Sequence, residues 1–174
     1  MRISVFVGAS VDGFIARANH ELDWLPEGGG EPHGYEEFMA SVEVLVIGRK
    51  TFEKVLTFTP WPYGSKRVVV LSSQQLDLSV AVGAIIEQMN GTPAEIAQQL
   101  GATGAGHLYI DGGITIQGFL QAGLVDRLII TRVPVLIGCG ISLFGTLPHD
   151  IRLKHLATRD FPSGLVQSEY QVLN

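Results

Sequence analysis

Four short polar segments each follow an apolar run, and the first of them has residue types that suit an anionic ligand. Gly48, Arg49, Lys50 and Thr51 come directly after the apolar, β-branched residues 44–47. Such a run predicts a buried strand, and the four residues then predict a turn that opens a helix. The turn places free backbone N–H groups and two cations at one point, which is the arrangement that a phosphate requires.

The other three segments also begin where a predicted strand ends. Residues 72–73 offer two serine hydroxyls, and residues 10–16 form a polar turn after the first strand. In residues 111–115, a pair of glycines allows close backbone approach to a ligand before a helix begins. A structural turn is the better explanation of each segment taken alone. None of them has the spacing of a dinucleotide-binding fingerprint or of a P-loop.

The elements that must position these segments alternate along the chain. Strands are predicted at residues 3–7, 44–47, 67–71, 80–84, 107–110, 124–131, 152–159 and 165–172, and helices at residues 35–41, 50–56, 92–100 and 114–122. This order predicts an α/β fold: a mainly parallel twisted sheet with helices on both faces and an antiparallel C-terminal edge hairpin. Because ligands bind beyond the carboxyl ends of parallel strands, the four segments are expected to converge.

Composition narrows the class of protein. The 174 residues are sufficient for one domain, predicted to span residues 1–174, and 46% of them are hydrophobic against 17% charged, which excludes a disordered chain. The net charge of −5 argues against a nucleic-acid binder. Cys139 is the only cysteine, which fits a reducing cytoplasm, and no histidine spacing predicts a metal site. The apolar residues 133–145 are too few to span a membrane.

Five segments taken together resemble the dihydrofolate reductase superfamily. They are Ser-Val-Asp-Gly-Phe-Ile-Ala (10–16), Asp-Trp-Leu (23–25), Val-Ile-Gly-Arg-Lys-Thr-Phe-Glu (46–53), Val-Val-Leu-Ser-Ser (69–73) and Ile-Asp-Gly-Gly (110–113). Residues 118–128 and 134–145 resemble the branch that contains the riboflavin-pathway reductase domain. The resemblance covers nearly the whole chain in the same order. It implies a three-layer α/β/α fold and an NADPH-dependent reductase.

The resemblance also implies where NADPH binds. The cofactor phosphates would be held by Gly48, Arg49, Lys50 and Thr51, with the Arg49 guanidinium at the 2′-phosphate and with Ser72 and Ser73 near that phosphate. The pyrophosphate would lie along Gly112, Gly113, Ile114 and Thr115. The nicotinamide would be flanked by Ala9 and Ile15. A cis peptide bond is expected at Gly112–Gly113. An apolar wall for the ring and a charged site for the phosphates are what hydride transfer needs.

The substrate side is less fully specified. The carboxylate that dihydrofolate reductases carry on their first helix would fall near His33 here. Glu36 and Glu37 could replace it, and Glu37 is the chosen candidate, with a solvent-facing acid on the helix as the favoured alternative. Asp111 occupies the position of the acid that the riboflavin branch uses, with capping of the next helix as the alternative. Trp24 is a candidate for stacking on a planar substrate, with core cover as the alternative.

The expected function is hydride transfer from NADPH to a C=N or C=O group of a heterocyclic or ring-opened pyrimidine substrate. The resemblance implies an activity like that of 5-amino-6-(5-phosphoribosylamino)uracil reductase. A non-catalytic nucleotide-binding domain and a true dihydrofolate reductase remain alternatives. The single cysteine excludes a zinc deaminase within this chain. A homodimer is expected, with residues 133–144 and the C-terminal strands as its interface, although burial within the monomer explains these apolar segments equally well.

Overall fold

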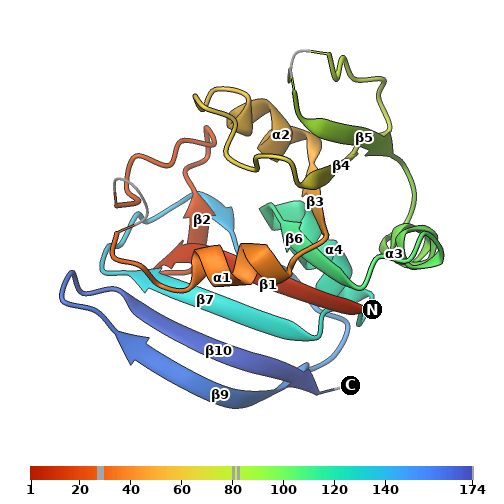
Figure 1. Cartoon of the computed structure of the whole chain (residues 1–174). Helices are drawn as coiled ribbons and strands as arrows, with labels where there is room; N and C mark the ends of the chain where they lie inside the picture. Colours follow the sequence, from red (N-terminus) through yellow and green to blue (C-terminus); the bar gives the residue numbers. More distant parts are fainter. Residues whose placement is uncertain (27–29, 80, 82, 174) are drawn as a thin grey trace.

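The structure is a computed structural model, and it describes residues 1–26, 30–79, 81 and 83–173. Within these residues the elements are β1 (Arg2–Ser10), β2 (Phe14–Ala16), α1 (Tyr35–Ser41), β3 (Val44–Gly48), α2 (Arg49–Val55), β4 (Arg67–Leu71), β5 (Ile85–Met89), α3 (Pro93–Ala102), β6 (His107–Asp111), α4 (Gly113–Gln121), β7 (Arg127–Val133), β8 (Ile141–Ser142), β9 (Arg152–Asp160) and β10 (Val166–Leu173). Figure 1 shows their arrangement.

Eight of these strands form one sheet, in the order β5-β4-β3-β6-β1-β7-β10-β9. The six strands from β5 to β7 are parallel to one another, whereas β10 is antiparallel to both β7 and β9. The hairpin of β9 and β10 therefore forms one edge of the sheet (Figure 1). This confirms the predicted mainly parallel sheet with an antiparallel C-terminal hairpin.

Helices cover both faces of the sheet because its central strands are apolar on both sides. Along β1, Val5 and Val7 pack into the core that contains the buried residues of α3 and α4, while Phe6 packs into the core that contains Phe38 of α1 and Phe52 of α2. Successive side chains of a strand point to opposite faces, so this alternation sets one pair of helices on each face. The predicted three-layer α/β/α architecture is confirmed.

The start of α3 shows how closely the sequence can specify an element. The Thr92 hydroxyl accepts a hydrogen bond from the Glu95 N–H at 3.3 Å, and the Glu95 carboxylate accepts one from the Thr92 N–H at 2.7 Å. Pro93 occupies the first turn, where its missing N–H costs nothing. This capping box satisfies two backbone donors, and it fixes the helix at the predicted residue.

The strand predicted at residues 80–84 is wrong in position. Residues 80 and 82 lie outside the described residues, and Ala81 lies in a turn, with its N–H donating to the Leu78 carbonyl at 3.3 Å. The strand is β5, which pairs with β4 as far as Met89 opposite Leu71. An edge strand buries only part of its surface, so its residues do not need the apolar pattern that made residues 80–84 look like a strand.

A second, two-stranded sheet of β2 and β8 was not predicted. It pairs Phe14 with Ser142 and Ala16 with Ile141. Two strands of three and two residues are too short to carry a periodic pattern, and only the fold brings them together. The pairing fastens the polar turn after β1 to the apolar segment before residue 145, and thereby places Ile15 and Ile141 next to the carboxyl end of the main sheet.

Candidate functional site

A cavity of about 850 Å³ lies at the carboxyl ends of β1, β3 and β6. The register of the sheet explains its position, because Ile47 at the end of β3 pairs with Asp111 at the end of β6, and Gly48 pairs with Leu71 at the end of β4. The polar segments that follow these strands therefore meet at one edge. The predicted site residues that line the cavity are Ile15, Gly48, Arg49, Lys50, Thr51, Asp111, Gly112, Gly113, Ile114 and Thr115.

The turns after β3 and β6 interlock so tightly that each needs a glycine. A Cβ at Gly48 would lie 2.9 Å from the Thr115 Oγ1, and a Cβ at Gly112 would collide with the Thr51 hydroxyl. Gly112 also has φ +94°, which L side chains rarely adopt. The close approach brings the first turns of α2 and α4 side by side along the cavity.

The predicted cis peptide bond at Gly112–Gly113 is wrong. Among the described residues, the cis peptide bond is Thr59–Pro60, so the glycine pair is trans. The positive φ of Gly112 already turns the chain from β6 into α4, and a trans bond therefore suffices.

Cations line one part of the cavity. The Arg49 Nη1 donates to the Glu53 Oε1 at 2.6 Å, and the Lys50 Nζ donates to the Glu53 Oε2 at 3.1 Å. Both hydrogen bonds lower the pKa of Glu53, and the bond from Lys50 has the larger effect. The three side chains are partly exposed, so such pairs contribute little to stability and exchange readily for another anion. The nine-residue helix α4 begins in the same cavity without a side-chain cap.

Asp111 lies at the apolar part of the cavity. Its carboxylate accepts a hydrogen bond from the Gly112 N–H at 2.7 Å, so it contacts the turn but is not the cap of α4, which is Gly112. Part of the Asp111 side chain is accessible from the cavity, yet burial raises the pKa of Asp111 to about 6. The hydrogen bond from the Gly112 N–H lowers this pKa, but its effect is smaller than that of burial. A carboxyl group of this kind can hold or release a proton near neutral pH.

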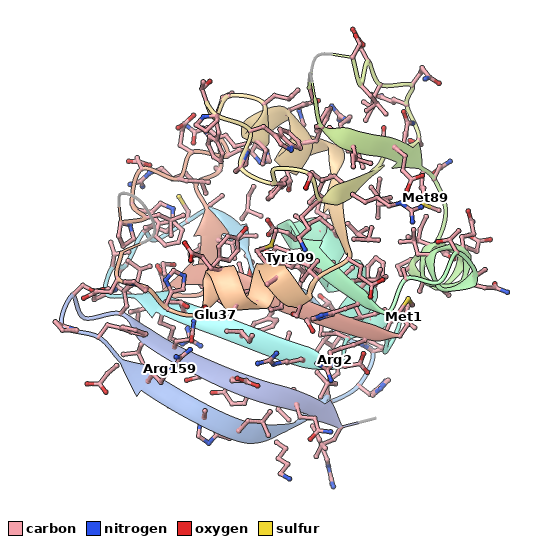
Figure 2. The ribbon with its side chains drawn as sticks, viewed as in Figure 1. Met1, Arg2, Glu37, Met89, Tyr109 and Arg159 are labelled. Carbon is pink, nitrogen blue, oxygen red and sulfur yellow. The ribbon has the colours of Figure 1, made fainter. Side chains whose placement is uncertain are left out.

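Aromatic residues surround this part of the cavity. Phe6, Tyr63 and Tyr109 line it, and the Tyr109 hydroxyl donates to the Phe6 carbonyl at 2.7 Å. Tyr109 lies in the middle of the molecule (Figure 2). Leu22 and Leu25, from the loop after β2, complete the apolar wall. The lining of the cavity therefore combines cations, apolar and aromatic side chains, and one buried acid close to the aromatic residues.

The sequence matches the family model of the RibD C-terminal domain over residues 2–167. The chain belongs to the RibD C-terminal domain family. The uncharacterized protein YwjB of Bacillus subtilis (strain 168) is 32% identical over 161 residues, which are 90% of each chain. The crystal structure of a Shewanella sp. PV-4 protein named for riboflavin biosynthesis is 36% identical, with a TM-score of 0.91 and full coverage of both chains.

Two more distant structures share the fold of this chain. Dihydrofolate reductase from Enterococcus faecalis, solved with NADP(H), matches with a TM-score of 0.67 at 16% identity, over 99% of this chain and 97% of its own. A Thermotoga maritima deaminase and 5-amino-6-(5-phosphoribosylamino)uracil reductase matches with a TM-score of 0.77 at 13% identity, over 99% of this chain and 56% of its own. Such identities show the fold alone, and they confirm the predicted one.

Five predicted site residues of this RibD C-terminal domain do not line the cavity. Ala9 is fully buried in the core between the sheet and α3 and α4. Ser72 and Ser73 follow β4 beside the cavity, and the Ser72 hydroxyl is engaged within its own turn, donating to the Gln74 carbonyl at 2.8 Å. The cavity edge reaches Leu71, immediately before them.

The two substrate candidates outside the cavity are Trp24 and Glu37. Trp24 stands between the lining residues Leu22 and Leu25 in the sequence of the loop after β2, but it is partly buried and does not line the cavity itself. Its indole N–H is buried and has no hydrogen-bond partner among the described residues. Glu37 is exposed on α1 (Figure 2). The next residue, Phe38, takes the buried position on that helix and turns Glu37 to its outer face.

Sequence reasoning missed several lining residues, of which His20, Lys54, Tyr63 and Tyr109 are polar. Lys54 lies one helical turn after Lys50, so the face of α2 that carries Lys50 also predicts Lys54. Its Nζ donates to the Glu21 carboxylate at 3.0 Å and ties the wall loop to α2. Tyr63 lies in the loop between α2 and β4, where no periodic signal exists.

The described residues of the domain include no group of three or more histidine, cysteine or acidic side chains that could hold a metal ion. Their helices also include none that is long and apolar enough to cross a membrane.

Proposed function

We propose that this RibD C-terminal domain is an NADPH-dependent reductase that transfers a hydride to a C=N or C=O group of a heterocyclic or ring-opened pyrimidine substrate. The observation that supports it is that one cavity combines the cations of α2 with apolar side chains and the buried acid Asp111. A dinucleotide needs both kinds of lining, because its phosphates are charged and its reacting ring must be kept from water.

The residues present fit NADPH. A cavity of about 850 Å³ has the size of a ligand site, and the uncapped N-terminus of α4 supplies unpaired N–H groups to a pyrophosphate. The Arg49 guanidinium would face the 2′-phosphate, with Lys50 beside it. Ile15 and the backbone of Gly8 would wall the nicotinamide. When bound, NADPH supplies the hydride.

Asp111 is proposed as the acid on the substrate side. With a pKa of about 6, its carboxyl group is protonated in a minor fraction of molecules at neutral pH and can give a proton to the atom next to the reduced carbon. The surrounding aromatic residues keep bulk water away from that exchange. Turnover is then expected to fall as the pH rises above 6, because the protonated form disappears.

The proposed function is tested by deuterium transfer. Purified protein is incubated with 4-deuterated NADPH and 5-amino-6-(5-phosphoribosylamino)uracil, and the product is examined by mass spectrometry. The proposal expects a product one deuterium heavier than that from unlabelled NADPH, and Asp111→Asn should slow its formation at least tenfold while NADPH affinity is kept. Glu37→Gln, on the exposed face of α1, serves as the control and should leave the rate unchanged.

One observation favours a second candidate, a non-catalytic nucleotide-binding domain. Helix α1 contributes no carboxylate to the cavity lining among the described residues, since Glu36 and Glu37 are both exposed. Under this candidate the protein binds NADPH but transfers no deuterium to the uracil, to dihydrofolate or to any metabolite in a cell extract. The same labelled cofactor therefore distinguishes the reductase from the non-catalytic domain. Deuterium transfer to dihydrofolate tests the remaining alternative, a true dihydrofolate reductase.

We also propose that the domain forms a homodimer through its C-terminal hairpin. Every residue of β9 is exposed, including Leu153 and Leu156. A nine-residue edge strand with free backbone groups is a template for pairing with a second strand. The exposed Leu136 and Phe144, in the segment expected at the interface, add apolar surface.

A further inference from the structure

Tyr63 is a buried phenol that the proposed chemistry has not yet used. It lies in the loop between α2 and β4, is 8% exposed and lines the cavity. Its ring packs edge-on against Trp61, with the centroids 5.3 Å apart and the planes at 90°. The Lys66 N–H donates to its carbonyl at 3.0 Å, which holds the backbone. The side chain is therefore fixed on the apolar wall rather than free to swing.

The hydroxyl of Tyr63 forms no hydrogen bond with the described residues, yet it is not sealed from solvent. The polar side-chain atoms that are sealed and unpartnered among those residues are the indole N–H groups of Trp24 and Trp61. Tyr63 and Asp111 both line the cavity, and the charge of Asp111 acts on the Tyr63 phenol, so the accessible hydroxyl is expected to open onto the cavity. Tyr109, on the same wall, differs because its hydroxyl donates to the Phe6 carbonyl at 2.7 Å.

A mostly buried hydroxyl that has no protein partner but stays accessible is free to bond water or a ligand. We infer that the Tyr63 hydroxyl is a substrate-binding group, which donates a hydrogen bond to a carbonyl oxygen or ring nitrogen of the molecule that is reduced. This inference rests on the proposed function, and it adds a second polar contact to that of Asp111. The two groups have different roles, because Asp111 gives a proton in the proposed reaction whereas Tyr63 donates a hydrogen bond that positions the substrate.

The electrostatics of the cavity define how Tyr63 acts. Burial raises the pKa of the Tyr63 phenol well above 10, and the negative charge of Asp111 raises it further. A phenol in this state keeps its proton at every physiological pH. Tyr63 therefore orients the substrate through a hydrogen bond, and the proton for the reaction comes from another group.

The first test needs neither cofactor nor substrate. Tm is measured for the free protein and for Tyr63→Phe, Tyr109→Phe and Tyr170→Phe, the last on β10 away from the cavity. If the Tyr63 hydroxyl is kept for a ligand, Tyr63→Phe has an unchanged or higher Tm. Tyr109→Phe loses an internal hydrogen bond and falls by about 2–4 °C. A comparable fall in Tyr63→Phe would show a structural role and overturn the inference.

The second test measures binding in the dead-end complex. With the protein saturated by NADP⁺, 5-amino-6-(5-phosphoribosylamino)uracil is titrated calorimetrically into the wild type, Tyr63→Phe and Tyr170→Phe. The inference expects an about tenfold higher Kd for Tyr63→Phe only, with an unchanged Kd for NADPH. Equal affinities for the uracil would refute it. Failure of the wild type to bind NADPH would instead refute the proposed function, and the Tm comparison would still decide the role of Tyr63.

Discussion

At the scale of single residues, the buried carboxyl group of Asp111 serves the proposed reaction but lowers the unfolding free energy of the protein. Its pKa is raised from 3.8 to about 6 by burial. A carboxyl group whose pKa is higher in the folded protein favours folding only below pH 3.8, and it loses that contribution as the pH rises to 6. Above pH 6 the buried charge therefore costs about 3 kcal/mol of unfolding free energy. Such a cost is retained in a protein when the group has a chemical role.

Asp111→Asn removes this cost. We expect the variant to be more stable than the wild type by about 2–3 kcal/mol at pH 7.5, and the difference to disappear near pH 4, where the wild-type carboxyl group is neutral. Urea unfolding at the two pH values measures it. Asp77→Asn is the control, since the Ser79 hydroxyl lowers the pKa of that exposed carboxylate and its replacement should give no gain. A gain for Asp111→Asn that is equal at both pH values would contradict the account.

At the scale of the elements, the turn from β6 into α4 depends on Gly112. An alanine there would be strained at φ +94° and would also collide with the Thr51 hydroxyl of α2. We expect Gly112→Ala to cost about 2–4 kcal/mol and to weaken NADPH binding, because the two helix starts must separate. Thermal unfolding and NADPH titration measure both effects.

Gly104 provides a matched control for this turn. It has nearly the same φ, +89°, but a Cβ there would meet nothing within 4 Å. Gly104→Ala should therefore cost only the backbone strain, about 1 kcal/mol, and leave NADPH binding unchanged. Equal costs for the two variants would show that the contact between the turns has no energetic weight.

The sequence predicted elements best where local chemistry determines them. The start of α3 follows from the Thr92 and Glu95 capping box, and β3 follows from its continuous apolar run. β5 was misplaced because its edge position demands little hydrophobicity, and β2 and β8 were missed because two or three residues carry no period. For the same reason Tyr63, in a loop, became visible as a cavity residue only in the folded chain.

At the scale of the whole molecule, the convergence of the segments near residues 48 and 111 is the main result predicted from sequence. It follows from the parallel order of β4, β3 and β6, whose carboxyl ends share one edge. The segment at residues 72–73 reaches that edge but not the cavity, because the chain turns away after Leu71. Strand order fixes which segments meet, whereas the path of each turn decides which side chains face the ligand.

The exposed hairpin gives a prediction at the same scale. Sedimentation equilibrium should give a mass of twice the 18.8 kDa of the chain. The double variant Leu153→Lys, Leu156→Lys should shift the protein toward the monomer, because it places charge on the exposed strand β9. A wild-type protein that sediments as a monomer at all concentrations would contradict the proposed homodimer.

The central claim, that this cavity binds NADPH by its phosphates, is tested most directly by calorimetric titration of nucleotide-free protein with NADPH and with NADH. The account predicts that NADPH binds more tightly than NADH. It also predicts that Arg49→Ala loses at least tenfold in affinity for NADPH but much less for NADH, whereas Arg152→Ala on the exposed β9 changes neither. The absence of binding heat with NADPH, or equal losses for the two nucleotides in Arg49→Ala, would contradict it.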